Sequence, residues 1–383
     1  MNVTATVDKN VCTILVSGKV DSTNAAQFEA MAAALDTEPT LILDFSELEY
    51  ISSAGLRVIL RFRKKHADLV VKNVSSDVYE VLDMTGFTEM MKVQRAYRTV
   101  SVEGCEIIGR GANGNVYRID PDTVVKVYVN ADSLADIEHE REVARTALVL
   151  GIPTALSYDV VKVGDHYASM FEMLNAKSFS KLLAANPDGV DEYAKMYIDL
   201  LRLIHGTEVP KGKLPDQREV AINWIDFLKN DLPAETYEKL RAMIVAIPYD
   251  NHMIHGDYHT KNIMLQNDEV ILIDMDTLAV GHPVLEVASM YNAYCGFHLL
   301  DHDNFEDFLG YPYEVGQKFW KKSLELYYNT TDPEALALYE KKAMTVGLVR
   351  LLRRGIRRNI DPKLLQLYRE NLCRLAQELD TLI

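Results

Sequence analysis

The sequence predicts two domains, an α/β domain over residues 1–98 and an α+β domain over residues 99–383. Two observations predict this division. Short strand patterns alternate with helical patterns in the first hundred residues, which is typical of a sheet covered by helices. Beyond residue 98, a glycine-rich turn lies between two strand patterns, and mostly helical sequence follows. The 383 residues are enough for two ordinary domains, and 48% of them are hydrophobic.

The elements of the first region follow from periodicity. Apolar and β-branched residues mark strands, and apolar residues three or four positions apart mark helices. A glycine, Gly18, is expected to end the first strand, and Asn24 precedes the first helical pattern. The predicted strands and helices are, in order, strand 11–16, helix from 24, strand 41–45, helix 54–67, strand 69–74, helix 77–84 and strand 91–93. Together they predict one compact domain whose sheet is covered by helices on at least one face.

Composition narrows the class of protein. No apolar run approaches the roughly 20 residues of a membrane helix, and the first residues do not resemble a signal peptide. The four cysteines are far apart and contain no CxxC pair, which favours reduced thiols in a cytoplasmic protein. Residues 1–98 carry a net charge of −2 and the remainder −13. We therefore expect neither a nucleic acid nor a membrane as partner, and a cationic or neutral small molecule fits better.

One stretch of the first domain carries a family resemblance. Residues 43–60 read LDFSELEYISSAGLRVIL, and this resembles the STAS domains of anti-sigma-factor antagonists. The resemblance implies that a serine before the second helix, here Ser53, is a phosphorylation site, since a helix N-terminus favours negative charge. It also implies an α/β domain with a mixed sheet and helices, and contact with a protein partner or a second subunit. The alternative is that Ser52 or Ser53 only caps the helix.

The second region opens with a G-x-G-x-x-G-x-V sequence formed by Gly109, Gly111, Gly114 and Val116. This pattern occurs in dinucleotide-binding folds, where a helix follows it, and in kinases, where it joins two strands over the ATP phosphates. Here a strand pattern, a turn at 120–122 and a second strand pattern follow. This order excludes the dinucleotide fold. It also places Lys126 in a strand, from which its ammonium group can bind phosphates.

A kinase lysine needs a carboxylate partner on the next helix. The predicted helix 133–150 carries Glu138, Glu140 and Glu142. We favour Glu142 as the partner, with Glu138 second, because both lie on a similar face. The alternative for any one of these glutamates is a solvated helix face.

The strongest motif lies in residues 253–276. Phosphoryl transfer to an alcohol needs a carboxylate that accepts the hydroxyl proton, and Asp257 is the predicted catalytic residue. Asn262 and Asp274 are the predicted Mg²⁺ ligands. A second set is predicted to support them: His255 and His259 brace the loop, and Asp276 is either a further carboxylate of the site or a structural one. A two-histidine metal site is the alternative for the histidines, but Gly256 favours a loop rather than a helix.

The H-G-D-x-H-x-x-N and I-D-x-D sequences resemble the aminoglycoside phosphotransferase and choline kinase branch of the protein-kinase-like fold. The resemblance covers residues 100–383 and implies a bilobal fold, with an N-lobe at about 99–174 and a C-lobe at about 175–383. It implies phosphorylation of a small molecule's hydroxyl with ATP and Mg²⁺ as cofactors, adenine bound near Glu172 and Leu174, and Glu286 in place of a structural aspartate.

Three functions remain open from the sequence. The first is a small-molecule kinase with a fused STAS module for regulation or interaction. The second is a protein kinase or switch that acts on Ser53 or on a partner's equivalent serine. The third is a non-catalytic, nucleotide-binding scaffold. A row of arginines, Arg350, Arg353, Arg354, Arg357 and Arg358, is interpreted as a solvated or acid-paired helix face, with contact to an anionic substrate or to the N-terminal domain as the alternative.

Overall fold

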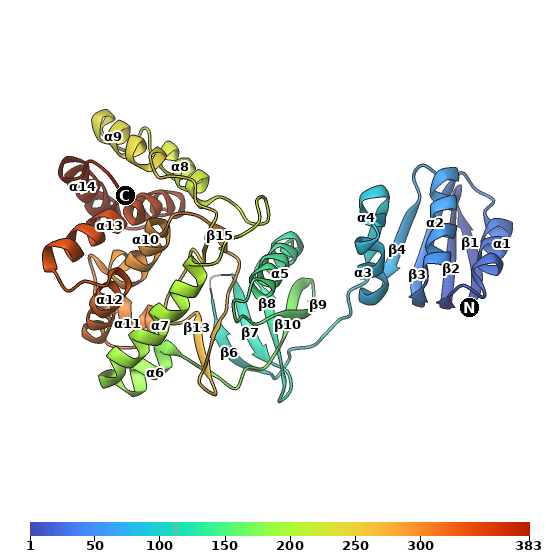
Figure 1. The fold of residues 1–383 in the computed structure, drawn as a ribbon. Coiled ribbons are helices and arrows are strands. Elements are labelled where there is room, and N and C mark those ends of the chain that lie inside the picture. Colours follow the sequence, from blue (N-terminus) through green and yellow to red (C-terminus); the bar gives the residue numbers. More distant parts are fainter. Residues whose placement is uncertain (112) are drawn as a thin grey trace. The chain divides into compact units, whose positions relative to one another are not determined.

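The computed structural model describes residues 1–111 and 113–383. They form two compact units, and Figure 1 labels the helices and strands. The first unit consists of Met1–Ile119, Val125–Asp132 and Tyr158–Met170. The second unit consists of Asp120–Val124, Ser133–Ser157 and Phe171–Ile383.

The first unit begins with a five-stranded sheet in the order β1-β2-β3-β4-β5. β1 and β2 are antiparallel, whereas β2, β3, β4 and β5 pair in parallel. The strands are β1 Asn2–Asp8, β2 Val11–Val20, β3 Thr40–Ile51, β4 Val70–Val74 and β5 Lys92–Arg95. The predicted mixed α/β domain is confirmed.

Helices connect the parallel strands, because a parallel pair needs a long crossover connection. They are α1 Ala25–Leu35, α2 Ser53–Lys65, α3 Ser76–Met84 and α4 Phe87–Met90. Alternate residues of β2 (Cys12, Ile14 and Val16) have no exposed surface, and the buried face of α2 includes Ile59 and Phe62. Burial of these apolar side chains stabilises the sheet and its helices as one core.

Two details of this domain differ from the sequence prediction. β1 was not predicted, because its alternating polar residues carry little apolar signal; it is an edge strand that pairs Asn2 with Ser17. β2 does not end at Gly18 but continues to Val20. Gly18 has φ +77° and lies at a register shift, so the glycine accommodates an irregularity within the strand rather than terminating it.

A second five-stranded sheet has the order β6-β7-β8-β10-β9. Its strands are β6 Glu106–Arg110, β7 Gly114–Arg118, β8 Thr123–Tyr128, β9 Ser157–Val163 and β10 His166–Glu172. β6 and β7 are antiparallel, so the predicted arrangement of a glycine-rich turn between strands is confirmed. Between β8 and β9 the chain forms the predicted helix, α5 Leu134–Val149.

The remainder of the second unit is mostly helical. Its helices are α6 Phe179–Ala185, η1 Pro187–Gly189, α7 Val190–His205, α8 Gln217–Phe227, α9 Ala234–Val245, α10 Pro283–Tyr294, η2 Gly296–His298, α11 Asp303–Leu309, α12 Tyr313–Tyr328, α13 Pro333–Arg358 and α14 Pro362–Glu378. Its short strands are β11 Lys177–Ser178, β12 Met253–Ile254, β13 Ile263–Gln266, β14 Glu269–Leu272 and β15 Ala279–Val280. Apolar and aromatic side chains from most of these helices form one core.

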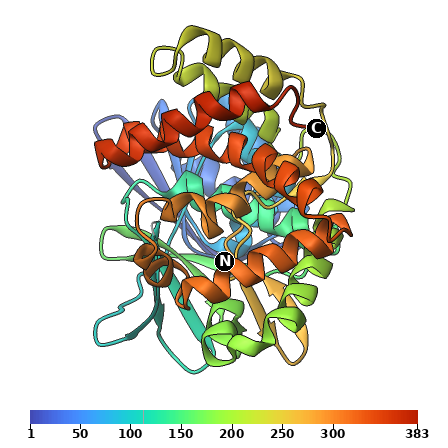
Figure 2. The ribbon, with the colours of Figure 1, turned by 90° about the vertical axis from the view of Figure 1, so that its left-hand side faces the viewer.

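The long helix α13 organises the C-terminal part of this unit. It packs against α10, α14 and α8, and α9 contacts both α8 and α14. Figure 2 shows α13 and α14, in red, beside α8 and α9, in yellow-green. Within the described part of the chain, no helix combines the length and the apolar character needed to span a bilayer.

Candidate functional site

A tight turn after β12 begins the site. β12 pairs with β15, which fixes the position of Ile254. Gly256 then has φ +79°, and a Cβ atom at this position would lie 2.7 Å from the carbonyl oxygen of Thr277. The Thr277 hydroxyl donates a hydrogen bond to the carbonyl of His255 (2.7 Å). Only glycine fits a left-handed residue this close to another backbone segment.

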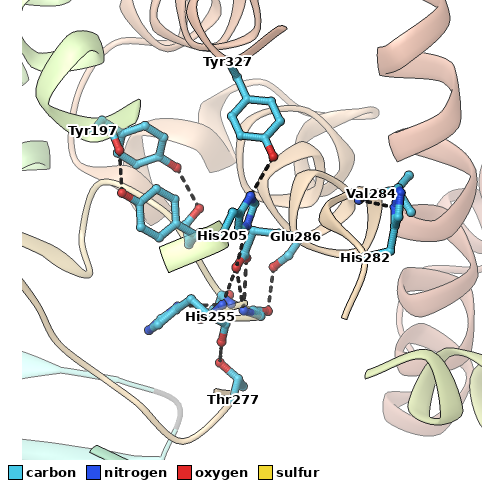
Figure 3. A network of polar contacts seen from close by, with 12 residues as sticks. Tyr197, His205, His255, Thr277, His282, Val284, Glu286 and Tyr327 are labelled. Atoms are coloured by element: carbon cyan, nitrogen blue, oxygen red, sulfur yellow. Dashed lines mark hydrogen bonds and ion pairs between the residues drawn. The ribbon is translucent and has the colours of Figure 1, made fainter. Parts of the chain in front are cut away.

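Glu286 of α10 holds the same turn from the other side. Its carboxylate accepts hydrogen bonds from the backbone N–H groups of His255 and Gly256, the latter at 3.1 Å (Figure 3). Glu286 has no exposed surface, and burial raises its pKa to about 7 although the backbone hydrogen bonds oppose this shift. Glu286 therefore anchors the turn, as expected for a replacement of the structural aspartate.

A buried histidine completes this network. The Nδ1 atom of His205 lies 2.7 Å from the Tyr327 hydroxyl, and its Nε2 atom lies 4.0 Å from Glu286 (Figure 3). Burial lowers the pKa of His205 to about 3. His205 is therefore neutral at physiological pH, and it packs beside the Glu286 carboxyl without adding a positive charge.

Asp257 follows the turn. Its backbone N–H donates to Nδ1 of His255 (3.3 Å), so the ring proton of neutral His255 lies on Nε2. One carboxylate oxygen of Asp257 lies 3.5 Å from Nε2 of His259, and the side chain is 43% exposed. Burial acts to raise the pKa of Asp257, but the charge and hydrogen bond of His259 and the charge of Arg350 lower it below its ordinary value. Asp257 is thus an ionised, accessible carboxylate.

Hydrogen bonds to backbone carbonyls link Asn262 to Asp257 and to the residue before Asp274. The Asn262 amide donates to the carbonyl of Asp257 (3.0 Å), which leaves its Oδ1 atom as the oxygen available to a cation. The Ile273 N–H donates to the carbonyl of Asn262 (2.9 Å), and Asp274 follows at once with φ +63°. This left-handed conformation is rare for a residue other than glycine, and such backbone outliers concentrate at functional sites.

The oxygen donors of Asn262 and Asp274 suit a magnesium ion. The described residues contain no cluster of three or more His, Cys, Asp or Glu side chains arranged to hold an ion. Mg²⁺ commonly takes one or two protein oxygens and completes its shell with substrate phosphates and water. Asn262 and Asp274 therefore fit a Mg²⁺ ion shared with a phosphate ligand.

A cavity of about 190 Å³ adjoins the turn. Gly256, Asp276 and Thr277 line it on the side of the loop, and Trp224 of α8 and Arg350 of α13 line it on the side of the helices. Asp276 thus lies at a cavity beside the predicted catalytic loop, whereas Trp224 and Arg350 join the site only through the packing of α8 and α13.

The glycine-rich loop and Lys126 belong to the first unit. Gly111 N–H donates to the carbonyl of Gly114, and a Cβ atom on Gly114 would lie 2.3 Å from the carbonyl oxygen of Val127. Val116 lies in β7, and the ammonium group of Lys126 in β8 lies 5.1 Å from the ring of Tyr128. Ala112, within the loop, lies outside the described residues.

The glutamates of α5 differ in their exposure. Glu142 and Glu138 are exposed, whereas Glu140 is only 7% exposed. Glu140 shares the buried face of α5 with Ile137 and Ala144, which lie three and four residues away. The spacing of these apolar neighbours in the sequence was the signal that could have identified Glu140 as the buried glutamate of this helix.

The predicted hinge residues lie at the end of β10. Glu172 is the last residue of that strand and is exposed, and Leu174 is partly buried. Between them, the Met173 N–H donates to the carbonyl of Asp122 (2.7 Å). The Met173 N–H is therefore already engaged, and the backbone groups of Glu172 and Leu174 remain the ones predicted to bind adenine.

Ser53 is exposed and is the first residue of α2. Ser52 occupies the N-cap position, but its side chain makes no capping hydrogen bond and its buried hydroxyl has no hydrogen-bond partner within the described residues. Ser52 therefore caps the helix by position, as one of the two alternatives had it, but without a side-chain hydrogen bond.

Comparison with known proteins identifies both parts of the chain. The family model for the phosphotransferase enzyme family matches residues 104–314, and the STAS domain model matches residues 2–101. BtrV of Bordetella bronchiseptica, described as an anti-sigma factor antagonist, is 40% identical over 84 residues, which cover 20% of this chain and 72% of BtrV.

Solved structures show the same fold for the larger part. A thermostable mutant of aminoglycoside phosphotransferase APH(4)-Ia in a ternary complex with ADP and hygromycin B has a TM-score of 0.52 at 12% identity. Its apo form has a TM-score of 0.50 at 12% identity, and both alignments cover 72% of this chain and 94% of the other. The family match spans more than half of the residues, and the chain therefore belongs to the phosphotransferase enzyme family and carries an N-terminal STAS domain.

Proposed function

We propose that the chain transfers the γ-phosphoryl group of ATP to a hydroxyl group of a small molecule. One observation carries this proposal: Asp257 is an ionised carboxylate that is 43% exposed, and its backbone neighbour Gly256 lines a cavity of about 190 Å³. Membership of the phosphotransferase family supports it. The ADP bound in the APH(4)-Ia complex supports a nucleotide as the phosphoryl donor.

In this proposal Asp257 orients the acceptor hydroxyl and receives its proton. The acceptor oxygen forms a bond to the γ-phosphorus, the bond from that phosphorus to the β,γ-bridging oxygen breaks, and ADP leaves. His259 and Arg350 keep Asp257 ionised before the step. His255 fixes the backbone of Asp257 through its Nδ1 atom.

The remaining site residues are assigned to the nucleotide. Asn262 and Asp274 would hold Mg²⁺, which neutralises phosphate charge when bound. Lys126 and the loop of Gly109, Gly111 and Gly114 are assigned to the phosphates. Glu142 stays the predicted carboxylate partner of Lys126, with Glu138 second, and Glu140 is the buried glutamate of the same helix.

The test is an ATP-consumption screen over a panel of hydroxylated metabolites, with Asp257→Asn as the blank. The wild-type protein should phosphorylate at least one acceptor, and the variant should lose about 10²- to 10⁴-fold in kcat, the usual contribution of a general base. Thermal shift with Mg-ATP should show stabilisation of both proteins, since bound ligand stabilises a fold. A wild-type protein that neither binds nor consumes ATP would overturn the proposal and favour the scaffold.

A second candidate function is phosphorylation of a STAS-domain serine, with the STAS domain as a protein-interaction module. The observation that favours it is the exposure of Ser53 at the start of α2, where a phosphate would meet unpaired backbone N–H groups. Similarity of the N-terminal domain to an anti-sigma factor antagonist adds to it.

Phosphate mapping by mass spectrometry tests this candidate. Wild-type protein and Asp257→Asn are incubated with Mg-ATP separately and as a mixture with distinguishable masses. Phosphate on Ser53 of the variant only in the mixture would establish transfer between chains. An unmodified Ser53 in every sample would exclude the candidate for this chain.

A further inference from the structure

The arginines of α13 have no acidic partners. Arg350, Arg353, Arg354, Arg357 and Arg358 are three or four residues apart or adjacent, and no carboxylate lies within 4.0 Å of any of them across residues 1–111 and 113–383. The predicted acid-paired face is therefore wrong. An unpaired row is unusual in a chain whose net charge is −15, because carboxylates are abundant elsewhere.

Three of these arginines are held on aromatic rings. The guanidinium carbon lies 5.3 Å from the ring of Trp224 for Arg350, 5.7 Å from Phe227 for Arg353 and 5.3 Å from Phe297 for Arg354. All three side chains are half-buried. Stacking on an aromatic face fixes the plane of a guanidinium group without neutralising its charge.

The same positive charge is partly desolvated. Burial lowers the pKa of Arg354, and repulsion from Arg358 and Arg350 lowers it further, while Asp257 opposes the shift. Burial and repulsion from Arg357 lower the pKa of Arg353. The row is therefore an electrostatic cost to the folded chain, which a bound anion would relieve.

Arg350 connects this row to the predicted catalytic loop. Its Nη1 atom donates to the carbonyl of Gly256 (2.9 Å) and to the hydroxyl of Ser289 (3.2 Å), and the side chain lines the cavity. Its Nε and Nη2 atoms make no hydrogen bond within the described part of the chain, so one edge of the guanidinium group remains for a ligand.

We infer that the cavity binds the acceptor through an anionic group, a carboxylate or a phosphate, which Arg350 recognises with Arg354 behind it. This inference rests on the proposed function and specifies its acceptor class. Asp276 lines the same cavity, so repulsion directs the anionic end of the acceptor toward Arg350. A volume of about 190 Å³ suits a small metabolite, since drug-sized ligands occupy roughly 300–1,000 Å³. The acidic composition alone had favoured a cationic or neutral acceptor.

Calorimetric titration of the full chain tests this inference with four probes of one carbon skeleton. They are glycerate, glycerol 3-phosphate, glycerol and 3-amino-1,2-propanediol, each titrated in saturating Mg-ADP so that the nucleotide phosphate site is filled. Glycerate or glycerol 3-phosphate should bind at least about 10-fold more tightly than glycerol, because a hydrogen bond to a charged group contributes roughly 1.5–3 kcal/mol. The two anions distinguish a carboxylate site from a phosphate site.

Three variants assign the binding to the arginines. Arg350→Gln should weaken binding of the anion about 10- to 100-fold and leave the affinity for glycerol unchanged. Arg354→Gln removes no hydrogen bond to the loop and should weaken anion binding by a smaller but measurable factor. If Arg350→Gln does not fold, this variant alone tests whether the arginines bind the anion. Arg358→Gln, exposed on the same helix, is the matched control and should bind as the wild type does.

The outcomes separate this inference from the proposed function. Equal binding of anions and glycerol, or anion binding unchanged in both Arg350→Gln and Arg354→Gln, overturns the anionic acceptor even if ATP is consumed. Failure to bind Mg-ADP overturns the proposed function instead. The four titrations are then repeated without nucleotide, and anion binding that depends on Arg350 would still support the anion site.

Discussion

Backbone conformation at single residues determines where the site's side chains lie. Gly256 and Asp274 both have positive φ, and each adjoins or carries a carboxylate assigned to the site. At Gly256 the conformation is compatible only with glycine, because a Cβ atom would collide with Thr277. At Asp274 a side chain is present despite the cost, which indicates that the surrounding hydrogen bonds determine the backbone there.

Substitution of Gly256 tests this contribution against a matched glycine. Gly310 has φ +83°, and no atom lies within 4 Å of the place that an alanine Cβ would take, so Gly310→Ala carries only the left-handed cost of about 1–2 kcal/mol. Gly256→Ala adds a steric collision and should lower the free energy of unfolding by a larger amount. It should also lower kcat, because the collision displaces the backbone directly before Asp257. Urea unfolding followed by the fluorescence of Trp224 and Trp320, together with kcat, measures both effects. Equal destabilisation of the two variants would contradict the argument.

At the scale of elements, α10 and α13 hold the loop that β12 begins. Glu286 of α10 binds its backbone N–H groups, and Arg350 of α13 binds the carbonyl of Gly256. The loop is thus held by a buried glutamate and a half-buried arginine, which lie 30 and 94 residues from Gly256 in the sequence. Long-range contacts of this kind depend on how the helices pack.

The pH dependence of stability reports on Glu286. Its folded-state pKa is about 7, above the ordinary value of about 4.3, so the folded state binds more protons between these values. This group therefore makes the protein less stable as pH rises from about 4.3 to 7, by up to roughly 4 kcal/mol. Glu286→Gln should lose this part of the pH dependence in urea unfolding. The exposed Glu235→Gln is the control and should keep the wild-type slope.

At the scale of the whole molecule, both units contain cysteines but no disulfide. Cys12 is buried, and Cys105, Cys295 and Cys373 are partly buried, all as free thiols. Burial raises the pKa of Cys12 and raises that of Cys295 well above its ordinary value. The prediction of reduced thiols stays a prediction, and two large apolar cores stabilise the described residues.

Thiol titration tests this description. Unreduced protein in denaturant should react at four thiols, and native protein should react slowly at Cys12 and Cys295, because a buried thiol with a raised pKa has little thiolate. A reducing agent should leave the melting temperature unchanged. Fewer than four reactive thiols in denaturant would contradict the prediction.

The sequence by itself determined the order of elements in the N-terminal domain and the residue types of the predicted catalytic loop. Apolar periodicity predicted most strands and helices of the N-terminal domain. The spacing of Asp257, Asn262 and Asp274 predicts a shared site, and the structure links Asn262 to Asp257 and to the residue before Asp274 through backbone hydrogen bonds. Local patterns report local geometry well.

Only the tertiary structure decided which distant side chains join that loop. Glu140 is buried and Glu142 exposed because α5 turns one face inward, and Arg350 and Trp224 line the cavity because α13 packs on α8. Neither helix carries a motif for this role. The arginine row appeared to be a solvated or acid-paired surface in the sequence because the aromatic rings beneath it belong to other elements, and the proximity of its charges to Asp257 arises from packing alone.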